Sequence, residues 1–249
     1  MLVYIDQTDN RCKCLSELMI SNGYKVTDDR ARLSDCQLLY LGKDGKGYEQ
    51  ENFKNGSTIL TLLKSQRFVY LSKEKNFNYD YLYRNKEFVL KNTYISDEAL
   101  FAYMIIDNII CLNEANVLIL GYGNCGKDLA GKFASFNAKV TISSRNNHYR
   151  DEIIENGYRY VCLSQLSLKG YNFIINTIPS NVIDEKMLKT IDTDTQIYDI
   201  ASKPYGLAKN LRTVNYHLLK KLPTKYAYRS SAEILYKAII KAADLNVKK

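Results

Sequence analysis

Residues 116–136, "NVLILGYGNCGKDLAGKFASF", decide the fold of the second half of this chain. An apolar run leads directly into glycines at positions 121, 123 and 126, and an amphipathic helical pattern follows. This spacing predicts a strand-to-helix turn that binds a dinucleotide, in which Gly121 turns the chain, Gly123 admits the pyrophosphate and Gly126 brings helix and sheet together. A tight turn without a ligand is the alternative.

The first turn of this predicted helix supplies hydrogen-bond donors. The amides of Asn124 and Cys125 have no helical partner, and the positive end of the helix dipole lies beside them. The free amides and the positive end of the dipole both favour binding of a phosphate. We interpret the Cys125 thiol as a small packing group rather than a nucleophile.

The end of the next predicted strand selects the cofactor. NAD sites usually place Asp or Glu there to hold the ribose 2′-hydroxyl. In "KVTISSRNNHYR" (139–150) the end carries Ser143, Ser144 and Arg145, and no carboxylate follows until Asp151. Hydroxyls and a guanidinium bind a 2′-phosphate that a carboxylate would repel, so we expect NADP(H). The alternative for Arg145 is an exposed loop arginine.

Two further predicted strands end in polar residues, in "INTIPS" (175–180) and "DIASKPYG" (199–206). Ligands of open parallel sheets bind outside the carboxyl ends of the strands. Near the ribose and nicotinamide we therefore expect Asn176, Thr177 and Pro179, and near the substrate Ala201, Ser202 and Lys203. A polar turn after each strand is the alternative.

Apolar runs alternate with helical patterns along most of the chain, which predicts an α/β protein with two α/β domains. In the second domain the predicted parallel sheet is of the doubly wound Rossmann type. The predicted divisions are an N-terminal α/β domain over 1–95, a linker helix and Rossmann domain over 96–229, and a C-terminal helix over 230–249 that packs back on the N-terminal domain.

Several local elements can be assigned as well. The linker helix is expected over 96–112, and the C-terminal helix is expected to open with Ser230 and Glu233 in capping-box spacing. In the first domain the predicted strands are "LVYI" (2–5), "QLLYL" (37–41), "STILTLL" (57–63) and "RFVYL" (67–71). His217 is expected just after a strand and is interpreted as structural.

Composition limits the classes of function. Lys plus Arg number 35 against 27 Asp plus Glu, giving +8, which fits a solvated basic surface or attraction of acidic small molecules. The basic residues form no dense block, so no nucleic-acid partner is expected. No apolar stretch is long enough to span a membrane, and we expect a cytoplasmic protein. Six cysteines without a CxxC pair and two histidines predict reduced thiols and no metal site.

The motifs together resemble the family of NADP-binding dipicolinate synthase subunits from spore-forming bacteria. The stretches that carry the resemblance are "LGYGNCGKDLA", "KVTISSR", "NFIINTIPSNVID", "YDIASKPYG" and "KLPTKYAYRSSAEIL", with "VYIDQTDNR" as a weaker match upstream. The resemblance marks a divergent member with a shortened N-terminal domain.

The resemblance implies an NADP-dependent oxidoreductase that forms dipicolinate (pyridine-2,6-dicarboxylate) from a dihydrodipicolinate-type precursor during sporulation. It implies a second, flavin-binding subunit, with any FMN on that partner and not on this chain. Two substrate carboxylates call for cations and hydroxyls. The candidates for the substrate are Arg11, Glu98, Lys203, Lys225 and Arg229, and Lys203 and Ser202 are the candidates near the reacting centre.

Departures from the family pattern keep other functions open. The family's "KPGG" is "KPYG" here, which puts Tyr205 at a glycine position. Two other glycines and a proline are replaced by Thr224, Glu233 and Tyr228. One alternative is a non-catalytic NADP(H)-binding regulatory or scaffold subunit of a flavoprotein. Another is a shikimate-dehydrogenase-like reductase, suggested by "INTIP". No general base stands out, and homo-oligomerisation is left open.

Overall fold

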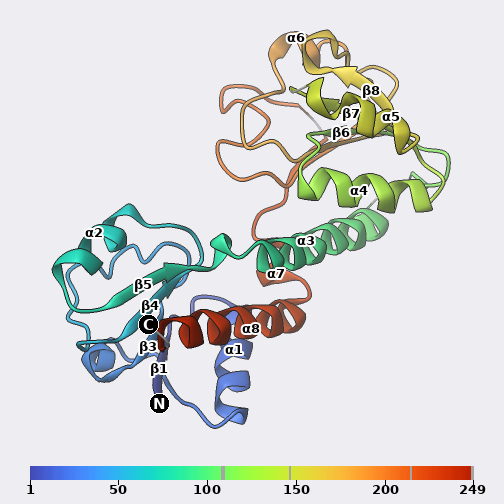
Figure 1. Ribbon diagram of the computed structural model, residues 1–249. Helices are drawn as coiled ribbons and strands as arrows, with labels where there is room; N and C mark the ends of the chain where they lie inside the picture. The colour runs from blue at the N-terminus through green and yellow to red at the C-terminus, as the bar shows by residue number, and fades with distance from the viewer. Residues whose placement is uncertain (108–109, 146, 214, 248–249) are drawn as a thin grey trace. The chain divides into compact units, whose positions relative to one another are not determined.

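The computed structural model describes residues 1–107, 110–145, 147–213 and 215–247, and divides the chain into two compact units. The first unit consists of Met1–Ile95 together with Pro223–Lys249, and the second is Ser96–Leu222 (Figure 1). Each unit is built on its own sheet, and both sheets are parallel. The α/β fold class with two α/β domains, expected from the sequence, is confirmed.

The sheet of the first unit has the strand order β2-β1-β3-β4-β5. Alternate residues of these strands point to opposite faces, so one core contains Val3 and Tyr40 while the other contains Tyr4 and Leu39. The strands are β1 Leu2–Ile5, β2 Lys25–Thr27, β3 Leu38–Tyr40, β4 Thr58–Thr61 and β5 Asn78–Tyr81.

Helices α1 (Asn10–Ser21) and α8 (Tyr228–Val247) cover one face of this sheet and lie side by side, blue and red in Figure 1. Their contact is apolar, because Leu15 of α1 and Leu235 of α8 are both fully buried in the same core. Burying a leucine side chain stabilises a fold by about 1.5–3 kcal/mol. Ser230 lies inside α8 rather than at its cap, which corrects the predicted helix start.

The run "RFVYL" is a helix and not the predicted strand. It lies in α2 (Gln66–Glu74), where Phe68 and Leu71 are buried and Tyr70 is half exposed. Ser65 caps the helix by accepting a hydrogen bond from the Phe68 amide. A buried pair spaced by three residues is typical of one face of a helix, and a short apolar run does not distinguish this from a strand.

Helix α3 (Lys86–Asp107) also starts earlier than the sequence indicated. The predicted linker helix covered 96–112, but the Asn85 side chain accepts hydrogen bonds from the amides of Glu87 and Phe88 and so caps the helix there. Residues 108 and 109 of the predicted helix lie outside the described residues.

The sheet of the second unit has the order β8-β7-β6-β9-β10-β11, all neighbours parallel. Numbered within the unit this is 3-2-1-4-5-6, the order of a Rossmann sheet. The strands are β6 Asn116–Leu120, β7 Lys139–Ser144, β8 Arg159–Cys162, β9 Phe173–Asn176, β10 Gln196–Asp199 and β11 Tyr216–Leu218, and the main helices are α4 Asn124–Ser135, α5 Arg150–Glu155 and α6 Glu185–Leu188.

Apolar cores cover both faces of this second sheet. Leu129 and Phe133 of α4 pack with Ile119 on one face, whereas Leu118 and Ile174 belong to the core on the other. His217 lies within β11 rather than just after a strand, and its ring stacks on Tyr198 with centroids 4.7 Å apart. The histidine is therefore part of the sheet's packing.

Three further findings concern the cysteines, membrane spans and metal sites. All six cysteines are free thiols. No described helix has both the length and the apolar composition that a bilayer span requires. Within the described part of the chain, no group of three or more His, Cys, Asp or Glu side chains is placed to hold a metal ion.

Candidate functional site

The strand order of the second unit reverses between β6 and β9, which lie next to each other at its centre. The chain leaves β6 toward β7 on one side, and β9 continues to β10 on the other. In open parallel sheets the ligand binds outside the carboxyl ends of the strands at such a reversal. The residues at these two ends are Leu120 and Asn176, and the glycine turn follows Leu120 directly.

The three glycines of the turn have different surroundings. Gly121 has φ +106°, and a Cβ there would stand 2.4 Å from Thr177 Oγ1. At Gly126 a Cβ would stand 2.2 Å from the carbonyl oxygen of Gly121, so the helix approaches the turn as closely as only glycine permits. Gly123 is exposed, and no described atom lies within 4 Å of its Cβ position. The turn is thus tight on the protein side and open at Gly123.

The start of α4 offers unpaired amides at this opening. Gly123 is the N-cap and no described side chain caps the helix, while the first helical hydrogen bond runs from the Lys127 amide to the Gly123 carbonyl. Asn124 is exposed beside the opening. Unpaired amides and the helix dipole suit this opening to an anion such as a pyrophosphate. The residues present therefore fit a dinucleotide.

Cys125 points away from this opening. Its thiol donates a hydrogen bond to Asp97 Oδ1 of α3, with Sγ and Oδ1 2.7 Å apart. Burial raises the pKa of Asp97 to about 8, and the hydrogen bond from Cys125 opposes the rise. Burial also raises the pKa of the Cys125 thiol well above its ordinary value, so the sulfur is protonated and unreactive. Cys125 anchors α4 to α3 and contributes only its backbone amide to the opening.

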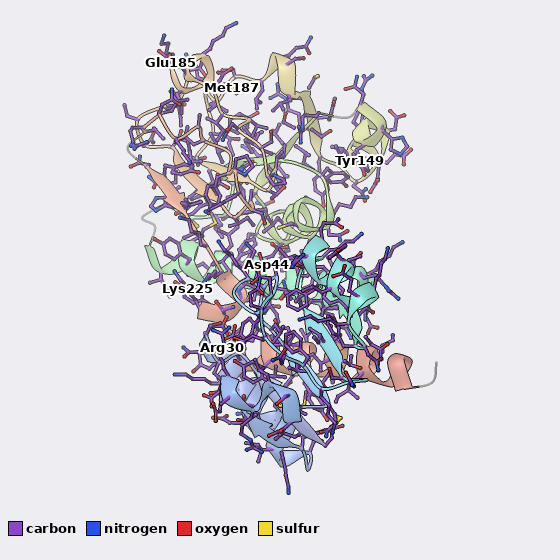
Figure 2. The ribbon with its side chains drawn as sticks, turned by 90° about the vertical axis from the view of Figure 1, so that its left-hand side faces the viewer. Arg30, Asp44, Tyr149, Glu185, Met187 and Lys225 are labelled. Carbon is purple, nitrogen blue, oxygen red and sulfur yellow. The ribbon has the colours of Figure 1, made fainter. Side chains whose placement is uncertain are left out.

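Of the three side chains predicted to bind the cofactor at the end of β7, Arg145 is exposed and the two serines are buried. Ser143 is fully buried and its hydroxyl has no hydrogen-bond partner among the described residues, and Ser144 is 5% exposed. Arg145 is exposed and lines a cavity of about 860 Å³ between the ends of β7, β8 and β9 and helix α6. Met187 of α6, labelled in Figure 2, lines the same cavity. Any choice of a 2′-phosphate would therefore rest on Arg145.

The predicted ribose-side residues are placed differently from one another. Thr177 packs against the glycine turn, and its hydroxyl donates to the Leu120 carbonyl at 2.8 Å. Pro179 is exposed. Asn176 is fully buried, and its amide group donates to the Ile178 carbonyl at 3.1 Å and to Asp199 Oδ1 at 3.0 Å. Asn176 therefore holds the strand ends in place rather than presenting its amide to a ligand.

The sequence analysis missed the centre of this network, Asp199 at the end of β10. It is fully buried, and its carboxylate accepts four hydrogen bonds from the described residues. The donors are Asn176 Nδ2 at 3.0 Å, the Ala201 amide at 3.0 Å, the Gly206 amide at 2.6 Å and the Tyr216 hydroxyl at 2.5 Å. The signal in the sequence was an aspartate in an otherwise apolar strand.

Asp199 fixes both ends of the loop that carries the predicted substrate residues. Ser202 and Lys203 are exposed within this loop, and Ala201 is half-buried. Tyr205 has φ +71°, a conformation that favours glycine, and Lys220 Nζ lies 5.1 Å from the centre of its ring. A tyrosine thus occupies a backbone position suited to the family's glycine.

The remaining substrate candidates are distributed over both units. Arg11 is buried in the first unit at the start of α1. Lys225, labelled in Figure 2, and Arg229 are exposed in the segment that returns to the first unit, where Arg229 Nε lies 3.9 Å from Glu233 Oε1. Glu98 is exposed and belongs to the second unit. Of all the candidates, Ser202 and Lys203 are the pair that one loop brings together.

The Rossmann order and the glycine turn define a dinucleotide-binding type of fold, whose site fits a pyridine nucleotide or a flavin. Residues 107–226 match the family "Flavin-binding monooxygenase-like". A segment is 31% identical over 97 residues to a dipicolinate synthase subunit of Bacillus subtilis (strain 168), covering 38% of this chain and 33% of the relative. The resemblance inferred from the motifs is therefore confirmed.

Solved structures share the fold over nearly the whole chain. A dipicolinate synthase subunit from Bacillus halodurans superimposes with a TM-score of 0.83 at 21% identity, covering 97% of each chain. A transhydrogenase from Sinorhizobium meliloti superimposes with a TM-score of 0.70 at 9% identity, covering 98% of this chain and 94% of the other. At these identities the likeness establishes the fold and not the reaction.

Proposed function

We propose that this chain is an NADP(H)-dependent oxidoreductase of the dipicolinate synthase type. The observation that carries the proposal is the glycine turn, which is closed by Thr177 on one side and open at Gly123 on the other. This geometry favours a bound pyrophosphate over a turn that has no ligand. The resemblance to the dipicolinate synthase subunit of Bacillus subtilis supports the reaction class.

The preference for NADP(H) rests on Arg145. No carboxylate occupies the end of β7, where an NAD site usually carries one, and the exposed guanidinium of Arg145 borders the adjacent cavity. A guanidinium binds a phosphate through paired charge-assisted hydrogen bonds. Flavin nucleotides lack a 2′-phosphate for Arg145 to bind, so we assign NADP(H) to this chain and FMN to a second, flavin-binding subunit.

The proposed reaction forms pyridine-2,6-dicarboxylate from a dihydrodipicolinate-type precursor during sporulation. A nicotinamide, when bound, would accept the hydride that leaves the dihydropyridine ring. The chain's own residues would bind and orient the two carboxylates, with Ser202 and Lys203 exposed on the loop fixed by Asp199. The free cysteines fit a reducing compartment, and we place the reaction in the cytoplasm.

A non-catalytic cofactor-binding subunit is the second candidate, and Tyr205 favours it. The ring stands where the family's glycine leaves the backbone bare, next to Ser202 and Lys203 in the substrate-side loop. In such a case the chain would bind NADP(H) and regulate or position the flavoprotein that performs the chemistry.

One assay separates the two candidates. The purified full chain is mixed with the precursor and NADP⁺, with and without a flavin-binding partner, and NADPH absorbance is followed. Turnover by the chain alone supports the enzyme and eliminates the scaffold. Tight NADPH binding without turnover under either condition eliminates the enzyme.

A further inference from the structure

The connection from β8 to β9 borders a cavity at the edge of the second sheet that is opposite the glycine turn. Parallel strands are usually joined by a crossover helix that packs on the sheet. Residues 163–172, all of them described, instead form one 3₁₀ turn at Leu163–Gln165 and no α-helix. The cavity beside this connection has a volume of about 870 Å³, and its lining includes Asn116, Lys139 and Arg159, the first residues of β6, β7 and β8.

The cavity lies over the sheet face that is turned away from α4. Thr141 of β7 pairs with Arg159 of β8, whereas the next residue, Ile142, belongs to the core beneath α4. Successive side chains of a strand point to opposite faces, so Thr141 and Arg159 project from the other face. Val161 and Leu166 also line the cavity and pack with the core of that face. Strands β7 and β8 are thus covered by an open groove (Figure 1).

Three cations line this cavity, which we call the basic groove. Lys139, Arg159 and Lys169 are all exposed, and no described carboxylate forms an ion pair with any of them. From strand geometry the Cα atoms of Lys139 and Arg159 lie about 8 Å apart. No Asp or Glu of the described chain is among the lining residues. Asp192 accepts a hydrogen bond from the Gly170 amide at 2.6 Å and does not line the groove. The basic groove therefore attracts anions.

Strand β8 shows what shape of anion fits. It ends the sheet, with β7 on one side and no described strand on the other. A free strand edge can form hydrogen bonds with an extended chain. Tyr158 and Tyr171, both half-buried, also line the groove and offer contact to apolar side chains. Because the three cations come from three separate segments, a chain of several charges can engage all of them, whereas a single small anion would engage fewer.

We infer that the basic groove is a docking surface for an extended acidic segment of a partner protein. The acidic side chains of the segment pair with Lys139, Arg159 and Lys169, and its backbone lies along the free edge of β8. The surface is at the amino ends of the strands, away from the dinucleotide opening at their carboxyl ends, so it does not depend on the proposed function.

The probe is a fluorescent eight-residue peptide of alternating glutamate and valine, titrated with the full chain and followed by fluorescence anisotropy. A peptide of alternating glutamine and valine has the same length without the charge. The test variants are Arg159→Gln, Lys169→Gln and the double variant. Arg150→Gln is the matched control, because Arg150 is exposed, belongs to the same unit and does not line the groove.

We expect the wild-type chain to bind the glutamate peptide at least about tenfold more tightly than the glutamine peptide. Each single variant should lose about threefold in affinity for the glutamate peptide and the double variant about tenfold, while Arg150→Gln keeps the wild-type affinity. The melting temperature should not fall in any variant, because the replaced side chains are exposed. The double variant should also bind NADPH as the wild-type chain does.

Four results would overturn the inference. The first is equal affinity of the wild-type chain for the two peptides, and the second is an equal loss in Arg150→Gln, which would indicate attraction by the net charge alone. The third is displacement of the peptide by inorganic phosphate at the same concentration of charge, or tighter binding of a single-stranded RNA. The fourth is self-association in sedimentation that the double variant abolishes, which would assign the groove to a second copy.

A parallel NADPH titration of the wild-type chain keeps this test separate from the proposed function. Peptide binding that depends on Arg159 and Lys169, without any binding of NADPH, would support the docking surface while the proposed function fails. NADPH binding with no preference for the acidic peptide would do the reverse.

Discussion

Replacing Gly123 with alanine would separate the phosphate site from the stability of the free protein. A Cβ at Gly123 meets no described atom within 4 Å, and its φ of −81° and ψ of −165° suit alanine. Alanine is a weaker N-cap than glycine by about 0.5–1 kcal/mol. Alanine also restricts the unfolded chain more than glycine does, which offsets this loss of stability by about 0.4–1 kcal/mol. The free energy of unfolding should therefore change by less than about 0.5 kcal/mol.

Binding of the dinucleotide should respond quite differently. The pyrophosphate has to approach the backbone at Gly123, and the new methyl group occupies that space. We expect the Kd for NADPH to rise at least about tenfold, which corresponds to about 1.4 kcal/mol. Fluorescence titration of the full chain measures the Kd, and denaturant titration measures the free energy of unfolding.

Two further glycines of α4 complete this test. Gly131→Ala is the control, because no described atom lies within 4 Å of its Cβ position, and it should stabilise the helix by about 0.5–1 kcal/mol with an unchanged Kd. Gly126→Ala puts a methyl 2.2 Å from a backbone carbonyl and should lower both stability and affinity. Wild-type affinity in Gly123→Ala would refute the reasoning.

Three other changes test the surroundings of the site. Because Tyr205 has φ +71°, Tyr205→Gly should be about 1 kcal/mol more stable than Tyr205→Ala in denaturant titrations, and equal stabilities would show no strain. Tyr216→Phe removes a donor to the buried Asp199 carboxylate and should lower the free energy of unfolding by about 1.5–3 kcal/mol, whereas a neutral effect would contradict the network. Asp97 keeps a proton that the unfolded chain loses near its ordinary pKa of 3.8, so stability should fall as the pH rises from there to about 8 and then level off. Asp97→Asn should flatten this slope in thermal melts and be more stable at pH 8 by about 1 kcal/mol or more, and an unchanged slope would count against a protonated Asp97.

The sequence predicted the cofactor turn because local chemistry alone determines it. A strand, three glycines and an amphipathic helix have one common solution, in which Gly126 lies against the Gly121 carbonyl of the same motif. The parallel sheet followed from the alternation of strands and helices, since parallel strands need crossover connections, and the Rossmann type followed from the glycine turn.

Tertiary context decided what the sequence did not reveal. "RFVYL" became a helix because Ser65 capped it and because Phe68 and Leu71 face the core together. The strand β5 was missed because "NYDY" is polar, as an edge strand is allowed to be. The sequence named Arg11 and Ser143 as site candidates, but it could not show that both are buried and that Arg11 Nε and Ser143 Oγ have no partner among the described residues.

Coenzyme choice is the most direct measurement of the central claim, that an open helix start binds a pyrophosphate and Arg145 selects the 2′-phosphate. NADPH and NADH are titrated into the wild-type chain and into Arg145→Ala. The account predicts that the wild-type chain binds NADPH about tenfold or more tightly than NADH, and that the variant binds both with similar affinity. Equal affinities in the wild-type chain, a preference for NADH, or no binding of either coenzyme would contradict it.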